Sequence, residues 1–463
     1  MKIVYLDKYL DEIEADLEIA FFKKHKYLKA NNMFLKRNKL FVKVSNYRFC
    51  AVVKACVDAI RYIIEANIYK IVKISLYKID NKGIQAIVDG LMLGGYSFKR
   101  YSSNDNDVVL KTVYIANESP REQELNFEDI RLKIDKHIIV NNCINLTRDM
   151  INSVANDTTP EKISNWIIEE IKDSSIQYNL YDEEFIKLEL PAFYDISKGS
   201  MNKPRLLHLK YNENQGYKKI VLIGKGVTFD TGGISLKPTE FMQDMRLDKA
   251  GAITIFGIIK GINDLKLPIE VHAILGFSEN MISEKAYKPG DIVKTRKSKT
   301  IEIMNTDADG RILLADLFEY AQDNIEDISY IVDYATLSGG VVSAIGQYSA
   351  AVIGHSKKLK DKIIKTSKNI DEMYVDLPFN RYFLDNNYES SIADFTNTPS
   401  SSIGGGVILG GSFIDSFVDK KYKKKWLHID ISGVSFIKNR WKYHEFGATG
   451  FGVKSGIKFI ETL

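Results

Sequence analysis

Residues 219–252 read KIVLIGKGVTFDTGGISLKPTEFMQDMRLDKAGA, and the rest of the chain can be arranged around them. Ile220 to Ile223 is a short apolar run of the kind that forms a buried strand, and the small residues after Leu247 predict the start of a helix. The glycine-rich loop between these elements carries Lys225, Asp230, Lys237 and Asp248. A charged loop between a buried strand and a helix is typical of a reactive site in an α/β protein.

Residues 305–316 read NTDADGRILLAD and form a second charged segment. They follow the alternating pattern of residues 300–304, which predicts a strand, and in extended chain Asp307 and Asp309 would lie on the same face. If the two segments meet, four aspartates and two lysines come together. Their carboxylates would repel one another strongly unless divalent cations neutralised them. The two segments therefore predict a metal cluster.

Both segments resemble the metal-site motifs of the leucyl aminopeptidase family, the cytosolic two-metal enzymes that remove N-terminal residues from peptides. The matching motifs are GKGVTFDTGGISLKP and NTDADGR. Three further segments, GSMNKPRLLHLKY (199–211), ENMISEKAYKPGD (279–291) and ATLSGG (335–340), resemble the flanking sequences of the family. The resemblance covers the chain from Thr159 onward and has one departure, because the family usually has Glu where this sequence has Asp309.

The resemblance implies a role for each charged residue of the two motifs. The side chains that would hold two divalent cations are Lys225 as a neutral amine, Asp230, Asp248, Asp307 and Asp309, with Asp230 and Asp309 as bridges. Oxygen-rich ligands suit Mn²⁺ and Mg²⁺, and Zn²⁺ also accepts carboxylates. Two such metals would activate a hydroxide for hydrolysis. Lys237 would stabilise the oxyanion of the tetrahedral intermediate, and Arg311 would hold a bicarbonate that shuttles the proton.

The resemblance also implies a substrate and an assembly. Met245, Thr336 and Ala448 would line the pocket for the first side chain of a peptide substrate. An apolar lining favours N-terminal Leu or Met over charged residues. A homohexamer is expected on the resemblance alone, because nothing in composition or periodicity reveals a subunit interface.

The hydrophobic pattern divides the chain into three parts and predicts an α/β fold. Residues 1–120 alternate strand and helix patterns and are interpreted as a small N-terminal α/β domain. Residues 121–158 contain a long linker helix, predicted over 122–153, and the catalytic domain of residues 159–463 starts with a helix at Pro160. Alternating runs in this domain predict a mixed, mainly parallel sheet with helices on both faces and reactive loops at the carboxyl ends of strands.

Composition is that of a globular protein. The chain has 463 residues, of which 45% are hydrophobic, which is enough for two or three domains with cores of their own. No apolar run approaches the roughly 20 residues of a spanning helix, so no membrane partner is expected. Three cysteines with unrelated spacing predict buried, reduced thiols. Because no export signal is found, a cytoplasmic location is expected.

Other interpretations of the two motifs are weaker. NTDADGRILLAD is close to a calcium-binding EF-hand loop, but strand-like KTIEIM precedes it where an EF-hand needs a helix. The GKG sequence lacks the following Ser or Thr of a phosphate loop. Aspartates and glycines also form ordinary turns, which would explain one motif but not two. The histidines form no HExxH pair and no GxSxG elbow occurs, which argues against histidine-bound zinc and serine catalysis.

Binding of nucleic acid is the remaining alternative. The net charge of +4 comes from 64 basic and 60 acidic residues, which is too balanced to indicate a nucleic-acid protein. One segment, KKYKKKW over 420–426, interleaves lysines with aromatics and is interpreted as a solvated turn before a strand. Some bacterial members of the family also bind DNA. The alternatives to a peptidase are therefore a DNA-binding architectural protein and a scaffold hexamer whose site is weakened by Asp309.

Overall fold

A computed structural model describes residues 1–22, 32–45, 49–76, 81–103, 108–117, 127–212, 217–368, 370–384, 388–399 and 404–463. The chain divides into two compact units. The first comprises Met1–Asn145 and Asn439–Phe446, and the second comprises Leu146–Lys438 and Gly447–Leu463. Both units combine β-sheets with helices, so the α/β class expected from the sequence is confirmed.

The first unit is built on a six-stranded sheet with the order β1-β6-β5-β2-β4-β3. Its strands are β1 (Lys2–Tyr9), β2 (Leu17–Phe22), β3 (Met33–Lys36), β4 (Lys39–Lys43), β5 (Ile71–Ser75) and β6 (Thr112–Asn117), and all neighbours pair in parallel except β3 and β4. Its helices are η1 (Leu10–Glu12), α1 (Phe49–Ala66), α2 (Asn81–Gly94) and α3 (Phe127–Asn152) as far as Asn145. Helices α1 and α2 pack closely at Gly90. A Cβ at this position would come within 2.5 Å of the Cβ of Cys56, so the close packing depends on glycine.

The second unit is built on an eight-stranded sheet with the order β15-β14-β17-β13-β9-β10-β8-β7. Its strands are β7 (Gln177–Tyr181), β8 (Arg205–Asn212), β9 (Lys219–Asp230), β10 (Glu270–Asn280), β13 (Tyr330–Ala335), β14 (Ser349–Ile353), β15 (Met373–Asp376) and β17 (Trp426–Asp430). The four central strands β17, β13, β9 and β10 are parallel, and antiparallel pairs flank them. The carboxyl ends of these four strands therefore share one edge of the sheet.

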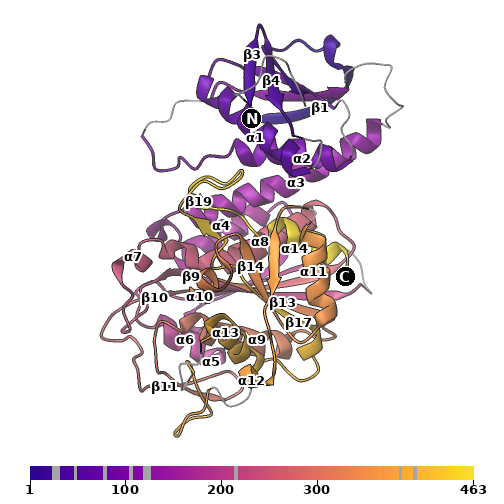
Figure 1. Ribbon diagram of the computed structural model, residues 1–463. Coiled ribbons are helices and arrows are strands. Elements are labelled where there is room, and N and C mark those ends of the chain that lie inside the picture. Colours follow the sequence, from indigo (N-terminus) through magenta and orange to yellow (C-terminus); the bar gives the residue numbers. More distant parts are fainter. Residues whose placement is uncertain are drawn as a thin grey trace. The chain divides into compact units, whose positions relative to one another are not determined.

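Helices cover both faces of this sheet (Figure 1). Helices α8 (Ala250–Asp264), α11 (Lys357–Lys368) and α14 (Val453–Glu461) lie on one face, and α6 (Pro191–Ser197), α9 (Asp309–Asn324) and α13 (Gly406–Asp415) lie on the other. The remaining elements are η2 (Ala155–Asp157), α4 (Pro160–Ile171), α5 (Glu183–Glu189), α7 (Thr239–Met242), η3 (Met245–Lys249), α10 (Gly340–Ile345), α12 (Arg381–Leu384), η4 (Lys423–Lys425), β11 (Ile292–Lys294), β12 (Thr300–Glu302), β16 (Phe395–Thr396), β18 (Phe436–Ile437) and β19 (Gly447–Ala448).

Helix α8 fixes the position of the loop that precedes it. Nearly all of its residues are buried, which explains why its sequence is apolar around the whole circumference. A Cβ at Gly224 of β9 would lie 2.5 Å from the Cα of Ala252, so only glycine lets the start of α8 approach the strand this closely. The residues just before α8 are thereby held against the carboxyl half of β9.

The structure corrects three expectations from the sequence. Strand β9 continues to Asp230, so Lys225 lies within the strand and not in a loop. Asp307 lies in a turn and Asp309 is the first residue of α9, so the two are not alternate residues of an extended chain. Cys56 and Cys143 are buried as predicted, but Cys50 is exposed.

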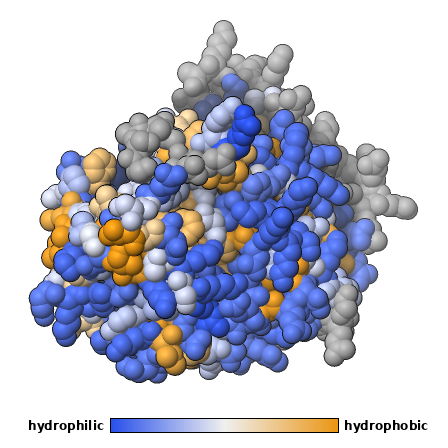
Figure 2. Space-filling model, turned by 90° about the horizontal axis from the view of Figure 1, so that it is seen from below, coloured by the Kyte–Doolittle hydropathy of each residue, from blue (hydrophilic) through white to orange (hydrophobic). Residues whose placement is uncertain are grey.

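Figure 2 shows one face of the molecule, seen from below. That face is largely hydrophilic, and its hydrophobic residues lie in separate small groups. No helix in the described ranges is both long enough and apolar enough to cross a bilayer.

Candidate metal centre

The charged residues of both motifs gather at the carboxyl edge of the central sheet. Asp230 ends β9, Asn280 ends the neighbouring β10, and Thr336 follows β13 on the other side of β9. Asp248 belongs to the short helix η3, which α8 holds against β9. Parallel strands thus deliver side chains from distant parts of the sequence to one point, as expected for an α/β sheet.

Three carboxylates form the centre of the site. One oxygen from each of Asp230, Asp248 and Asp309 lies within 4.8 Å of the others, and all three residues are buried. The Oδ1 atom of Asp230 accepts hydrogen bonds from Gly232 N at 2.7 Å and from Asn280 Nδ2 at 3.0 Å. The Oδ2 atom of Asp309 is buried without a hydrogen-bond partner among the described residues. Burying a carboxylate oxygen without a partner costs free energy, so a cation bound at this atom would be stabilising.

Lys225 faces these carboxylates from within β9. Its ammonium group donates to Asp248 Oδ1 at 2.7 Å and to the carbonyl oxygen of Thr336 at 2.7 Å. Gly310 provides the space, because a Cβ at that position would lie 2.4 Å from Cε of Lys225. The glycine after Asp309 is therefore required by the packing of a lysine.

Lys237 joins Asp307 to the three carboxylates. Its Nζ atom lies 2.7 Å from Asp230 Oδ2 and also forms a hydrogen-bonded ion pair with Asp307 Oδ1. The loop that carries Lys237 turns at Gly232, whose φ of +83° is a conformation that favours glycine. In this arrangement the ammonium group stands between two carboxylates, at a place where a metal ion would be attracted.

The site is short of positive charge. Four carboxylates face two ammonium groups, which would leave an excess of two negative charges if all four carboxylates were ionised. Burial, and then the charge of Asp230, raises the pKa of the Asp309 carboxyl well above its usual value. Burial alone would lower the pKa of Lys225, but the charges of Asp248, Asp309 and Asp230 raise it. In the same way, nearby carboxylates raise the pKa of Lys237 against the effect of its burial.

These residues fit a pair of divalent cations. The buried oxygens, the unpartnered Asp309 Oδ2 and the excess of negative charge all favour added positive charge. Carboxylate oxygens are ligands of Mn²⁺ and Mg²⁺, and Zn²⁺ accepts them together with nitrogen. Lysine can bind a metal only as a neutral amine, so metal binding at Lys225 would require loss of its proton.

The remaining residues singled out from the sequence are placed less directly. Arg311, in the first turn of α9, donates to the carbonyl oxygen of Asn397 at 3.0 Å and to the hydroxyl of Tyr388 at 3.3 Å. Thr336 donates its hydroxyl to Asp248 Oδ1 at 2.7 Å. Met245 begins η3, and Ala448 is buried in β19.

Three supporting residues were missed by the sequence analysis. Asn280 bridges the two motifs, because its Nδ2 also donates to the carbonyl oxygen of Thr306 at 3.0 Å. Tyr287 donates to the same oxygen at 2.6 Å, and the hydroxyl of Thr306 donates to the carbonyl of Gly232 at 2.6 Å. Asn280 and Tyr287 both lie in residues 279–291, and the resemblance of that segment to a flanking sequence of the family was the signal that could have identified them.

The fold and the site define an α/β protein with a buried cluster of carboxylates and lysines at the carboxyl ends of parallel strands. Residues 145–456 match the catalytic domain of the cytosol aminopeptidase family, Peptidase_M17, and the chain belongs to this family. It is accordingly a metal-dependent aminopeptidase that acts on peptides.

Relatives extend over most of the chain. A probable cytosol aminopeptidase of Campylobacter jejuni is 35% identical over 480 residues, which cover 99% of this chain and 98% of the relative. One of Helicobacter hepaticus is 39% identical over 395 residues, covering 85% and 81%. Among solved structures, the bottromycin maturation enzyme BotP in complex with Mn is similar, with a TM-score of 0.86, 24% identity and coverage of 97% and 99%. At this identity the structural likeness shows the fold alone.

Proposed function

We propose that this chain releases apolar N-terminal residues, Leu or Met above all, from short peptides with the help of two divalent cations. The observation that carries the proposal is the buried group of Asp230, Asp248 and Asp309, which Lys225 and Lys237 only partly neutralise. Family membership supports aminopeptidase chemistry, and this group supplies the place for it.

The residues that would hold the cations are Lys225, Asp230, Asp248, Asp307 and Asp309. When bound, two divalent cations polarise the scissile carbonyl, lower the pKa of water and bind the free amine of the substrate. In this proposal the two cations are Mn²⁺ or Zn²⁺, and Mg²⁺ is the alternative.

Lys237 is the candidate for stabilising the oxyanion. Its ammonium group keeps its proton, because the surrounding carboxylates raise its pKa. At present it is paired with Asp230 and Asp307, and cations that take over those oxygens would free it to face the substrate. A preorganised charge of this kind acts mainly in the transition state.

Arg311 is the second candidate for catalysis, as the residue that holds a bicarbonate. Nη1 of its guanidinium group donates to Asn397 O and to the Tyr388 hydroxyl, and its buried Nε has no hydrogen-bond partner among the described residues. A bicarbonate would give that donor an acceptor.

Selectivity and assembly are further parts of the proposal. Met245, Thr336 and Ala448 would line the pocket for the first side chain. The homohexamer and the cytoplasmic location rest on the resemblance and on the names of the relatives as cytosol aminopeptidases. The DNA-binding and scaffold alternatives are not favoured, because the family is one of aminopeptidases.

The test compares free and acetylated peptides. The purified chain should hydrolyse leucine amide and short Leu or Met peptides, lose activity with a chelator and regain it with Mn²⁺ or Zn²⁺. Peptides with an acetylated N-terminus should be inert, because their amine cannot bind a metal. Equal turnover of both would contradict the proposal.

A further inference from the structure

We propose that a basic hollow at the amino ends of the central strands binds a small anion that carries several phosphate groups. The hollow has a volume of about 490 Å³. Five lysines from three segments line it, namely Lys218, Lys358, Lys362, Lys424 and Lys425. Lys218 directly precedes β9, Ser329 directly precedes β13, and Lys425 directly precedes β17. The hollow thus lies at the strand ends opposite to the metal centre, and the inference goes beyond the proposed function.

The five lysines of the hollow have no Asp or Glu partners. None of them forms an ion pair within 4 Å with an Asp or Glu side chain in the described part of the chain, and none of the described side chains that line the hollow is acidic. Lys218 instead donates to a main-chain oxygen of Leu463, the last residue of the sequence, and Lys362 donates to the backbone carbonyl of Thr462. Burial, and then the charges of Lys218 and Lys358, lowers the pKa of Lys362. Five ammonium groups therefore gather here without a neutralising acidic side chain, and an anion would relieve their repulsion.

Polar groups of the backbone and side chains add to this charge. Ser356 and Lys358 line the hollow from the start of α11, a helix of 12 residues, so the positive end of its dipole lies at the hollow. The hydroxyl of Ser356 accepts from Leu359 N at 3.3 Å, and that of Ser329 accepts from Lys219 N at 3.3 Å. Each hydroxyl keeps a proton to donate. Ammonium groups, a helix start and hydroxyl donors together are the groups that bind phosphate.

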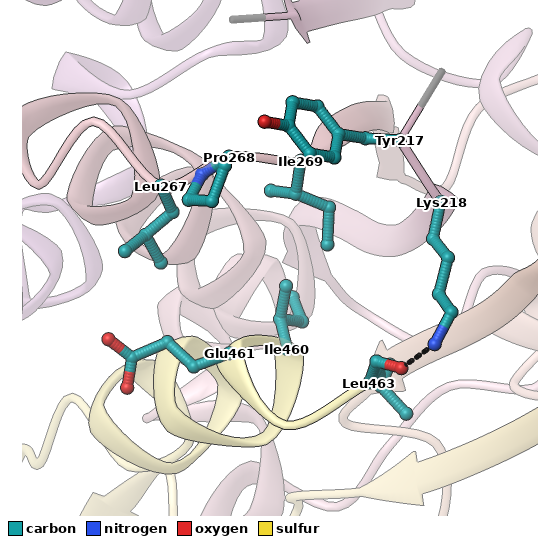
Figure 3. Close-up of a pocket in the computed structure, with 8 residues that line it drawn as sticks. All are labelled: Tyr217, Lys218, Leu267, Pro268, Ile269, Ile460, Glu461 and Leu463. Atoms are coloured by element: carbon teal, nitrogen blue, oxygen red, sulfur yellow. Dashed lines mark hydrogen bonds between the residues drawn. The ribbon is translucent and has the colours of Figure 1, made fainter. Parts of the chain in front are cut away.

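A second hollow adjoins the first and indicates how the ligand could extend. It also has a volume of about 490 Å³ and shares Lys218 and Leu463 with the basic hollow. Figure 3 shows the ring of Tyr217 over Pro268 and Ile269, with Ile460 on the opposite wall. The carboxylate of Glu461 points away from Lys218 (Figure 3). Phosphate groups among the lysines could therefore belong to inorganic polyphosphate or to a nucleotide whose base packs on Tyr217.

The test is calorimetric titration of the metal-loaded full chain with inorganic triphosphate. We expect binding with a dissociation constant below about 1 mM that weakens as salt is added. The double variant Lys358→Gln, Lys362→Gln should bind at least about tenfold more weakly, because it removes two charge-assisted contacts. The matched control Lys365→Gln, Lys368→Gln changes two exposed lysines that do not line the hollow on the same helix. It should stay within about twofold of wild type.

Two further arms identify the source of the phosphates. Tighter binding of adenosine triphosphate than of triphosphate, lost in Tyr217→Ala, would support a nucleotide, and equal binding would support inorganic polyphosphate. The proposal is overturned if triphosphate does not bind, if both double variants lose affinity equally, or if duplex DNA binds the hollow more tightly than triphosphate. Hydrolysis of leucine amide should be unchanged in both double variants, which shows that they are folded.

Discussion

Replacing Gly310 by Ala should weaken metal binding while the chain stays folded. A Cβ at this position would lie 2.4 Å from Cε and 2.9 Å from Nζ of Lys225. Carbon atoms in contact are normally about 3.5 to 4 Å apart, so the lysine side chain must move by roughly 1 Å. The protein cannot yield instead without disturbing Asp309, which is the neighbouring residue and accepts a hydrogen bond from Gly310 N at 2.6 Å.

A displacement of this size should weaken metal binding strongly and change the stability of the fold only slightly. Metal–ligand distances tolerate only about ±0.2 Å, so Lys225 would lose its place as a ligand. Mutating a residue that only hydrogen-bonds to a metal ligand already costs about 10- to 100-fold in metal affinity, and we expect at least that loss for Gly310→Ala. Gly310 is the second residue of α9, where Ala is favoured over Gly by up to about 1 kcal/mol. That gain offsets part of the overpacking cost of about 1 to 3 kcal/mol.

Calorimetric titration with Mn²⁺ and with Zn²⁺ measures the affinity, and thermal unfolding without metal measures the stability. Gly406→Ala is the matched control, because Gly406 is the first residue of α13 and the nearest atom to its Cβ would be Ser338 Oγ at 3.6 Å. We expect the control to bind metal like wild type. If Gly310→Ala also does so, Lys225 is not a metal ligand or moves without consequence, and our account of the site is wrong.

Three more predictions concern single side chains. Asp309→Glu restores the residue usual in the family and should tighten the more loosely held metal, as titration with Mn²⁺ would show; equal or weaker affinity would mean that the start of α9 is adapted to Asp. Lys237→Ala should lower kcat by roughly 10² to 10³ with little change in KM, and an unchanged kcat would remove Lys237 from the chemistry. Burial, and then the charges of His272 and Lys210, lowers the pKa of His208 to about 3. As pH falls below about 6.5, His208 therefore takes up a proton in the unfolded chain but stays neutral in the folded chain. The free energy of unfolding should then drop by up to about 1.4 kcal/mol per pH unit between pH 6.5 and 3. Urea unfolding at pH 7.5, 6 and 5 should show a smaller drop in His208→Gln, and identical slopes would contradict it.

The sequence predicted the strands of the second unit better than it predicted the reactive residues on them. The apolar run of residues 220–223 identified β9, because an interior strand of a parallel sheet is buried on both faces. It did not show that the strand continues through Lys225, since a lysine between two glycines looks like a loop. Lys225 is buried in the strand because Asp248 and Thr336, 23 and 111 residues later, accept its hydrogen bonds. No local pattern contains those partners.

The same limit explains the wrong geometry at the second motif. Alternation before Asn305 correctly predicted β12, which also excludes the helix that an EF-hand needs. Asp309 nevertheless starts a helix, where an acidic residue is favoured by the helix dipole. The intervening turn is held by Asn280 and Tyr287, which donate to Thr306 O from a different segment.

The two lysines of the site explain how a group of four aspartates, three of them buried, can exist in a folded chain without metal. Each ammonium group pairs with carboxylates at 2.7 Å, Lys225 with Asp248 and Lys237 with Asp230. A buried charge that lacks a partner costs several kcal/mol, so these pairs keep the unloaded site from unfolding the edge of the sheet. In the proposed metal site the same pairs would oppose metal loading, because a cation would have to displace Lys237 from Asp230 and Lys225 would have to lose a proton. The unpartnered Oδ2 of Asp309 is the position that the lysines leave open, and it is therefore the point at which the first cation gains most.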